Sequence, residues 1–349
     1  SMPRYPNHSK HLLALAAMVC LACLTGCGDS QHEMVDESST GYLLDPPELS
    51  VGAFPPVDEG VPVLCYHYFR SGFDPAYLMK VLGSVLFGMP ALGPREFWTT
   101  PVSEFEKHLR YFRDTGTVVM TLDEVADLVA DGRPLPARAV VLTIDDADRS
   151  VHELAWPLLR KYGMRAHLFV PTAKVGTTWS DLEVCTWEQL QEMGASGNIL
   201  VDSHTRDLHF KVRAAGSMEP VFFHPDRIPG VALSTNLDDL ALRVREHGRQ
   251  DLPENLAALL SGELAPVGVD LMASRLDLWA GAGARAGWLA WPYGFATDEL
   301  DSLSRAVGFR GTVSLFPEAF TAADSTLQVG RFALTAKSTL AHIEGVFPR

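Results

Sequence analysis

The stretch RAVVLTIDDADRS, residues 138–150, places two adjacent carboxylates, Asp145 and Asp146, directly behind an unbroken apolar run. Continuous runs of branched aliphatic residues, such as residues 138–144 here, are typical of strands that are buried on both faces of a parallel sheet. In sheets and barrels of this kind, the chemistry is found at the carboxyl ends of the strands. The stretch therefore predicts a buried parallel strand with functional groups at its end.

Helix and strand signals alternate on both sides of this stretch, which favours a largely parallel α/β sheet or barrel. We expect strands at residues 61–69, 118–120, 138–144, 166–170, 199–203, 288–291 and 312–315. We expect helices at residues 103–116, 121–132 and 151–162 and from residue 186 onward, with capping boxes at Ser103/Glu106, Thr121/Glu124 and Thr186/Gln189.

The composition is that of a globular protein with enough apolar material for one large domain or two small ones. The chain has 349 residues, of which 47% are hydrophobic and 21% are charged, and its formal net charge is -14. A polyanion would be repelled by this charge, and no run of Lys or Arg provides a local exception. The sequence therefore argues against nucleic acid as a partner.

The N-terminal sequence predicts a targeting segment. Arg4 and Lys10 precede the apolar run Leu12 to Leu24, which has the length of a secretory signal core and is short for a membrane span. The run ends in LTGC, residues 24–27, which resembles the lipobox of bacterial lipoproteins; the alternatives are an ordinary cleaved signal or a buried helix. The resemblance implies an exported protein that is anchored to a membrane through lipidated Cys27 and faces the periplasm or the cell surface.

The rest of the chain divides into a tether and a folded domain. Residues 28–60 contain eight Asp or Glu, no Lys or Arg and two Pro pairs, as expected for a solvated tether. The domain at residues 61–349 is interrupted by insertions at about 71–98 and 211–286, the first of which is either a lid, a membrane-contacting helix or an extra helix on the core. Within the domain, Cys65 and Cys185 are expected to be buried thiols that do not form a disulfide.

Three predicted strand ends carry the chemistry. Besides the two carboxylates, VDSHTRDLH (201–209) places His204 and His209 after one strand, and LAWPYG (289–294) ends another. One carboxylate and two imidazoles form a ligand set that suits zinc or another divalent transition ion, and the second carboxylate is then available as a general base. Each feature alone is weak, because Asp pairs usually cap helices or form turns; their convergence predicts a metal site.

Together these motifs resemble the polysaccharide deacetylases of carbohydrate esterase family 4, the NodB-homology group. The resemblance runs from about residue 61 to residue 331 and passes through VPVLCYHYF (61–69), FEKHLRYFRDTG (105–116), LPARAVVLTIDDADRSV (135–151), PLLRKYGMRAHLFV (157–170), TWEQLQEM (186–193), SHTRDLH (203–209) and WPYG (291–294). The branch that de-N-acetylates poly-β-1,6-N-acetylglucosamine is the most similar. This resemblance implies a distorted (β/α) barrel with insertions.

The resemblance also implies roles for individual residues. Asp145 would be the general base, and Asp146, His204 and His209 would bind a divalent transition metal, with zinc favoured and cobalt or nickel as alternatives. His67 would be the general acid.

The backbone N–H of Tyr293 would help to bind the oxyanion of the tetrahedral intermediate. Trp291, Pro292 and Gly294 would contribute to substrate binding; Trp291, like Tyr68, would either stack on a sugar ring or be a buried aromatic.

Three departures from the family pattern stand out. Ala147 replaces a glycine, which is tolerable only if its φ is negative, and Ala290 stands where the family has an arginine that orients the base. Leu340 and His342 are separated by only one residue, so the usual C-terminal Leu-x-x-His signature is missing. These departures indicate either a subfamily that lacks these residues or a chain that is losing its catalytic activity.

Other histidines are given structural roles. His108 is expected on an exposed helix face, His167 within a strand and His152 on the helix that follows the Asp pair, where the alternative to a structural role is indirect support of the site.

The leading hypothesis is a metal-dependent N-deacetylase whose partner is an extracytoplasmic, acetylated amino-sugar polysaccharide of the poly-N-acetylglucosamine type. The alternatives are an esterase for O-acetylated polysaccharide and a catalytically impaired glycan-binding lipoprotein of the same fold. The lipid anchor would make a membrane the second partner, and the oligomeric state stays open.

Overall fold

The computed structural model describes residues 52–72, 94–229 and 262–347, which all belong to one compact unit of the chain, Ser38–Arg349. The predicted signal with Cys27, most of the predicted tether and much of both insertions lie outside the described residues. Those assignments remain predictions. Among the described residues, no helix combines the length and the apolar character needed to cross a membrane.

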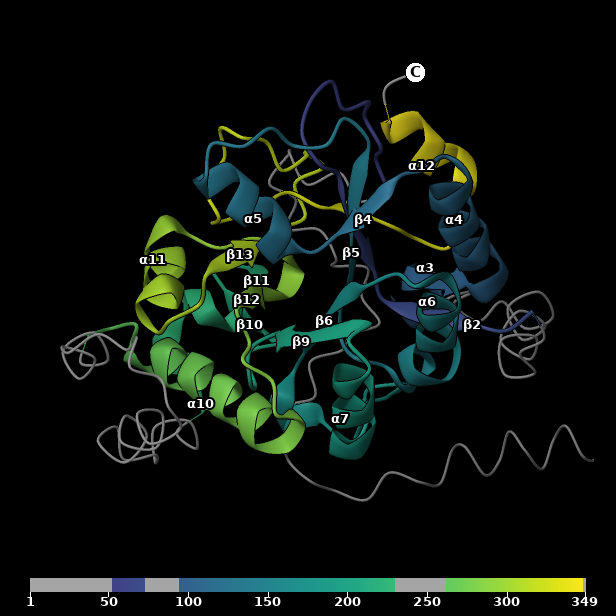
Figure 1. Cartoon of the computed structure of the whole chain (residues 1–349). Coiled ribbons are helices and arrows are strands. Elements are labelled where there is room, and N and C mark those ends of the chain that lie inside the picture. The colour runs from purple at the N-terminus through teal and green to yellow at the C-terminus, as the bar shows by residue number, and fades with distance from the viewer. Residues whose placement is uncertain (1–51, 73–93, 230–261, 348–349) are drawn as a thin grey trace, which may run out of the picture. The chain divides into compact units, whose positions relative to one another are not determined.

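Eight parallel strands form the central sheet, in the order β13-β12-β9-β6-β5-β1-β14, with β4 beside β5 (Figure 1). The strands are β1 (Val63–Tyr66), β4 (Val118–Met120), β5 (Ala139–Ile144), β6 (Ala166–Val170), β9 (Ile199–Ser203), β12 (Trp288–Ala290), β13 (Gly311–Val313) and β14 (Phe332–Ala333). The expected distorted (β/α) barrel is confirmed.

Strand β5 is the centre of this arrangement. All six of its residues are buried, as the apolar run predicts. One edge of β5 pairs with β1, while its other edge pairs first with β4 and then with β6. Because every neighbour is parallel, the carboxyl ends of these strands lie at the same edge of the sheet.

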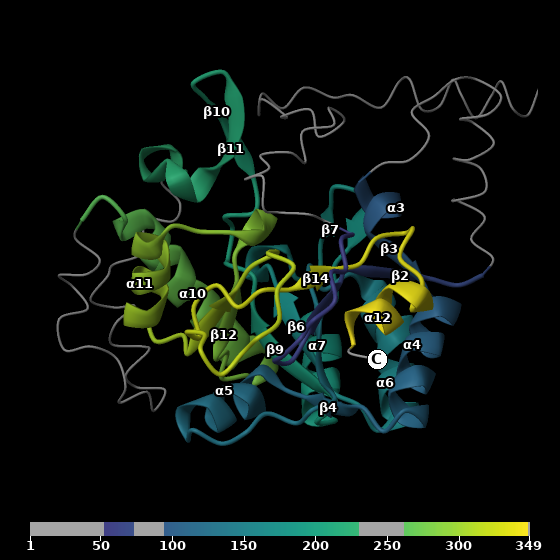
Figure 2. The same cartoon turned by 90° about the horizontal axis from the view of Figure 1, so that it is seen from above.

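Helices surround the strands, as Figure 1 shows, and three small strand pairs lie outside the sheet. The helices are α3 (Pro94–Trp98), α4 (Val102–Asp114), α5 (Leu122–Ala130), η1 (Val151–Ala155), α6 (Trp156–Tyr162), η2 (Thr172–Lys174), α7 (Trp187–Ala195), η3 (Val221–Phe223), η4 (Pro225–Arg227), α10 (Ala265–Ala282), η5 (Pro292–Gly294), α11 (Asp298–Ala306) and α12 (Leu340–Val346). The small pairs are β2 (Tyr68–Arg70) with β3 (Thr99–Pro101), β7 (Thr178–Trp179) with β8 (Leu182–Glu183), and β10 (Lys211–Ala214) with β11 (Ser217–Pro220), a hairpin that extends away from the sheet in Figure 2.

Two of the three predicted capping boxes are present, at the starts of α5 and α7. The third, Ser103 with Glu106, is wrong. Helix α4 begins at Val102 and its N-cap is Pro101, which makes no side-chain cap. Pro101 has an extended backbone directly before the helix, and the helix begins at Val102. Ser103 therefore lies within the first turn and cannot be the N-cap.

His108 is not on an exposed face, contrary to the prediction. It is fully buried, and its Nδ1 lies 3.0 Å from the hydroxyl of Tyr66. On α4 the buried residues are Phe105, His108, Leu109 and Phe112, which share one face at helical spacing. The same apolar spacing in the sequence places His108 on the core side.

His167 belongs to a buried network that ties four elements together. The backbone N–H of Leu122 donates to its Nε2 (2.9 Å), so Nδ1 carries the proton and donates to Asp202 Oδ2 (2.7 Å). The other oxygen of Asp202 accepts the N–H groups of Gly287 and Trp288 at 2.9 and 3.0 Å. Asp202 thus joins β6, β9 and the start of β12.

We predict that Asp202→Asn lowers the free energy of unfolding by about 2 kcal/mol, because one amide oxygen cannot replace both carboxylate oxygens and the amide NH₂ would face the N–H of His167. Urea unfolding followed by circular dichroism measures the change. Asp131→Asn, at an exposed residue, is the matched control and should change stability little. Equal stabilities of the two variants would contradict the prediction.

Candidate active site

The predicted site residues come together at the carboxyl edge of the sheet. Asp145 and Asp146 directly follow β5, His67 follows β1, and His204 follows β9. Tyr293 lies in the turn after β12. Three of these strand ends are those that the sequence pattern predicts, and the fourth, after β1, is the one that the resemblance implies for His67.

Asp146, His204 and His209 form a ligand set. The Nε2 atoms of His204 and His209 lie 3.4 and 3.5 Å from Asp146 Oδ1. Bonds of about 2.0–2.1 Å in a tetrahedral zinc site separate such donor atoms by about 3.3 Å, so the spacing suits one ion. Asp146 Oδ1 is buried without a hydrogen-bond partner among the described residues, as expected for an oxygen that a metal ligates. The residues therefore fit a divalent cation.

The backbone fixes the tautomer of His204. Its Nδ1 lies 2.7 Å from the carbonyl oxygen of Ala290. A carbonyl only accepts hydrogen bonds, so Nδ1 carries a proton and Nε2 is the atom that faces Asp146. A neutral ring held in this way presents the Nε2 lone pair, the arrangement in which a histidine binds a metal. Burial lowers the pKa of His209 to about 4, so the His209 ring is neutral near pH 7.

Tyr68 orients the carboxylate of Asp146, a role that sequence analysis missed. Its hydroxyl donates to Asp146 Oδ2 at 2.5 Å, which leaves Oδ1 directed toward the two histidines. Tyr68 is 6% exposed, so its ring is packed in the protein and does not offer a face to a sugar. Burial alone would raise the pKa of Asp146, but the neighbouring histidines outweigh it and hold that pKa well below its usual range.

Asp145 is paired with an arginine. Arg331 Nη1 and Nη2 donate to the two oxygens of Asp145 at 2.7 and 2.9 Å, and Arg331 is fully buried. Burial by itself would raise the pKa of Asp145, but the charge of Arg331 outweighs it and keeps the carboxyl ionised. Ala290 supplies no guanidinium, as the sequence analysis states, but Arg331 pairs with Asp145 from another part of the chain. Arg331 is the residue directly before β14, far from the Pro-Tyr-Gly motif in the sequence.

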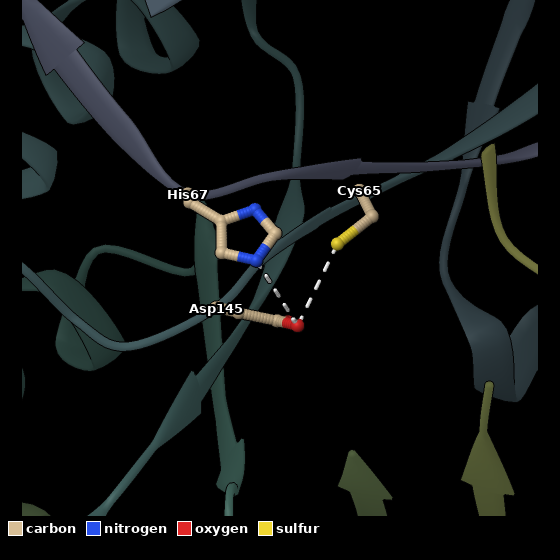
Figure 3. Close-up of side chains that lie close together, drawn as sticks. All are labelled: Cys65, His67 and Asp145. Carbon is tan, nitrogen blue, oxygen red and sulfur yellow. Dashed lines mark hydrogen bonds and ion pairs between the residues drawn. The ribbon is translucent and has the colours of Figure 1, made fainter. Parts of the chain in front are cut away.

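His67 lies on the other side of Asp145. Its Nε2 is 4.0 Å from Asp145 Oδ2, and its ring stacks on Trp98 with centroids 4.3 Å apart. Cys65 Sγ also donates to Asp145 Oδ2, at 3.5 Å (Figure 3). Burial lowers the pKa of His67, and the charge of Asp145 opposes this in part. Trp98 and Cys65 were not recognised as parts of the site from the sequence.

The turn after β12 has an unusual backbone. Tyr293 and Gly294 have φ values of 65° and 91°. A side chain at Gly294 would lie 2.5 Å from Leu315, so this position requires glycine. The Tyr293 ring packs against His209 (4.9 Å), and Lys211 Nζ lies 4.5 Å from its centroid.

Trp291 is a buried aromatic residue, so the predicted role in binding substrate is wrong for its side chain. It is 1% exposed, and its Nε1 donates to Asp301 Oδ1 at 2.9 Å. Its neighbour Pro292 is buried as well. The indole is thus part of the core beneath the turn.

The backbone of Ala147 also contradicts the expectation of a negative φ, because its φ is positive. Asp146 and Ala147 have φ values of 69° and 54°, a strained arrangement that costs about 1–3 kcal/mol per residue. Two contacts hold it in place: the Ala147 side chain is buried in the core, and the Ala147 carbonyl accepts the N–H of Cys185 at 2.9 Å. Such strain is common beside functional sites.

Helix α10 supports the loop that carries the histidines. The two oxygens of Asp270 accept the backbone N–H groups of Arg206 and Asp207 at 2.7 and 2.9 Å. Seven residues later, on the same helix face, Asp277 accepts from Arg206 Nε at 3.2 Å. Burial raises the pKa of Asp270 to about 7. Part of the segment expected as an insertion at 211–286 thus holds the loop between His204 and His209.

His152 has a structural role away from these ligands. Its Nε2 lies 2.9 Å from Glu192 on α7, and its ring stacks on Trp156 at 5.2 Å.

We predict that Asp270→Asn weakens metal binding about 10- to 100-fold, because the amide accepts one N–H group and repels the other, so the loop between His204 and His209 loosens. Competition with a chelator measures the dissociation constant of zinc. Asp131→Asn serves as the exposed control. An unchanged constant in a folded Asp270→Asn variant would show that α10 does not position the ligands.

The chain is similar to known polysaccharide deacetylases. The family model described as polysaccharide deacetylase matches residues 132–227. Among curated proteins, the putative polysaccharide deacetylase YxkH of Bacillus subtilis is 32% identical over 107 residues, 31% of this chain and 37% of the relative. The poly-beta-1,6-N-acetyl-D-glucosamine N-deacetylase of Staphylococcus aureus is 32% identical over 108 residues, with the same coverage. The match thus spans little more than a third of these relatives.

Solved structures match over a larger part of the chain. IcaB from Ammonifex degensii has a TM-score of 0.57 and 26% identity, over 80% of this chain and 94% of that one. A de-N-acetylase from Aggregatibacter actinomycetemcomitans has a TM-score of 0.56 and 21% identity, over 82% of this chain and 99% of that one, and supports the fold. Residues 132–227 therefore match the polysaccharide deacetylase family, and the chain shares the fold of these solved structures.

Proposed function

We propose that this chain is a metal-dependent deacetylase that removes N-acetyl groups from an exported polysaccharide of the poly-N-acetylglucosamine type. The observation that carries the proposal is the division of labour between adjacent carboxylates. Asp146 lies with two histidines in a ligand set, whereas Asp145 is held ionised by Arg331. The names of the Staphylococcus aureus relatives support the choice of substrate.

Asp146, His204 and His209 would hold the divalent cation, with zinc favoured and cobalt or nickel as alternatives. When bound, the cation acts as a Lewis acid that polarises the acetyl carbonyl and lowers the pKa of a water molecule. Asp145, ionised through Arg331, takes the proton from this water. Asp145 and Asp146 are consecutive, yet their carboxylates have different targets. The strained backbone at Asp146 and Ala147 lets Asp146 face the cation while Asp145 faces the water.

His67 donates a proton to the leaving nitrogen. Its Nε2 faces Asp145, and stacking on Trp98 fixes the plane of its ring. The negative charge of Asp145 favours the protonated imidazole, while burial disfavours it. The backbone of the Tyr293 turn, which packs beside His209, binds the oxyanion.

Export and lipid anchoring through Cys27 belong to the same proposal. The lipobox LTGC at residues 24–27 supports them, followed by the acidic tether of residues 28–60. Such an anchor would hold the enzyme at the membrane beside a polymer that is leaving the cell.

We predict that Asp145→Asn and His204→Ala each lower acetate release from poly-β-1,6-N-acetylglucosamine oligomers by at least about a hundredfold. His204→Ala should also lose bound metal, whereas Asp145→Asn should keep it. His152→Ala is the matched histidine control, since His152 pairs with Glu192 on α7. Activity like the wild type in Asp145→Asn would overturn the proposal, and faster release from acetylated xylan would favour an esterase.

We predict that Arg331→Lys moves the acidic limb of the kcat/KM profile to higher pH. Arg331 lowers the pKa of Asp145, and Asp145 works as a base only when ionised; a single ammonium group in place of the bidentate guanidinium lets that pKa rise. The pH dependence of acetate release measures the shift, and circular dichroism confirms folding. Arg310→Lys, at a partly exposed ion pair, should leave the limb in place. An unmoved limb in folded Arg331→Lys would exclude this role.

A further inference from the structure

A second group of metal-binding atoms lies beside the proposed base. Cys65 and His67 are two residues apart along β1 and its exit, and Asp145 follows the neighbouring strand β5. One donor atom from each of the three residues lies within 4.8 Å of the others, and Figure 3 shows the thiol and the imidazole both directed at the Asp145 carboxylate. All three side chains are buried.

The spacing is close to that of a tetrahedral zinc site. Bonds of about 2.3 Å to sulfur and about 2.0 Å to oxygen or nitrogen separate sulfur from oxygen by about 3.5 Å and nitrogen from oxygen by about 3.3 Å. Here Cys65 Sγ and Asp145 Oδ2 are 3.5 Å apart. The distance from His67 Nε2 to the same oxygen, 4.0 Å, is somewhat longer. To reach the zinc spacing, His67 Nε2 would move by about 0.7 Å toward Asp145 while the ring stays stacked on Trp98.

The charges and protons of the group allow an ion to enter. The thiol of Cys65 now donates its proton to Asp145 Oδ2, and a bound cation would replace that proton, which leaves to solvent. The thiolate adds a negative charge beside the cation, which Asp145, already paired with Arg331, does not supply alone. A carboxylate offers about four lone-pair positions, so Asp145 can bind an ion through Oδ2 and keep Arg331 at Oδ1.

We propose that Cys65, His67 and Asp145 form a second, inhibitory metal site for a thiophilic divalent cation such as Cd²⁺ or excess Zn²⁺. The site shares no residue with Asp146, His204 and His209, and it alone contains sulfur. An ion there occupies the base and the acid together, so hydrolysis stops although the first site stays loaded. This inhibition, but not the binding, rests on the proposed function. Mg²⁺ and Mn²⁺, which prefer oxygen ligands, should not inhibit.

The test titrates Cd²⁺ into protein that already holds one equivalent of Co²⁺. The wild type should take up a second ion and develop an ultraviolet charge-transfer band from cadmium bound to thiolate. Cys65→Ser should lose the band and be inhibited about tenfold or more weakly, relative to its own uninhibited rate. Cys185→Ser removes the other buried thiol of the described residues and should behave like the wild type.

The outcomes are distinct. A band of equal strength in folded Cys65→Ser, or a single bound ion in the wild type, would overturn the site. A band without inhibition would overturn the inhibitory role alone. If Cys65→Ser does not fold, His67→Gln tests the site instead: it should keep the band but bind the second ion more weakly, and unchanged affinity would overturn the site. If the wild type releases no acetate, the proposed function fails. The charge-transfer band and the number of bound ions still show whether the second metal site exists.

Discussion

Arg331 and Asp145 form a bidentate ion pair inside the protein, and the chemistry of the site depends on it. A buried carboxyl without a partner takes up a proton, because burial disfavours its charge. Arg331 prevents this, and its own Nε is held by the carbonyl of Ser314. The pair therefore keeps Asp145 ionised although it is buried, and it fixes the strand end from which Asp146 reaches the histidines.

Much of the fold could be predicted because its signals are local. The apolar run of β5 and the capping boxes of α5 and α7 each involve residues a few positions apart. The parallel order of the strands then brings Asp145 and His204 to one edge. Arg331 and Asp270 could not be found in this way, because each reaches the site through a partner that is distant in sequence.

Two apparent defects of the sequence have physical explanations. Ala147 adopts a positive φ despite its side chain, and the surrounding core and the Cys185 hydrogen bond hold it there. Ala290 lacks a guanidinium, yet its carbonyl fixes the tautomer of His204 while Arg331 serves Asp145 from elsewhere. The departures that favoured drift toward inactivity are thus compatible with an intact site.

The separation of Asp145 and Arg331 along the chain has a consequence for how the protein matures. The two residues are 186 positions apart, and Arg331 enters through β14, a strand of only two residues. Contacts of such long range close late, after the local helices and the early strands have formed. While the chain is being made, Asp146, His204 and His209 are all synthesised well before Arg331. The Asp145 carboxylate therefore gains its buried arginine partner near the end of folding, when the segment around residue 331 docks against β1.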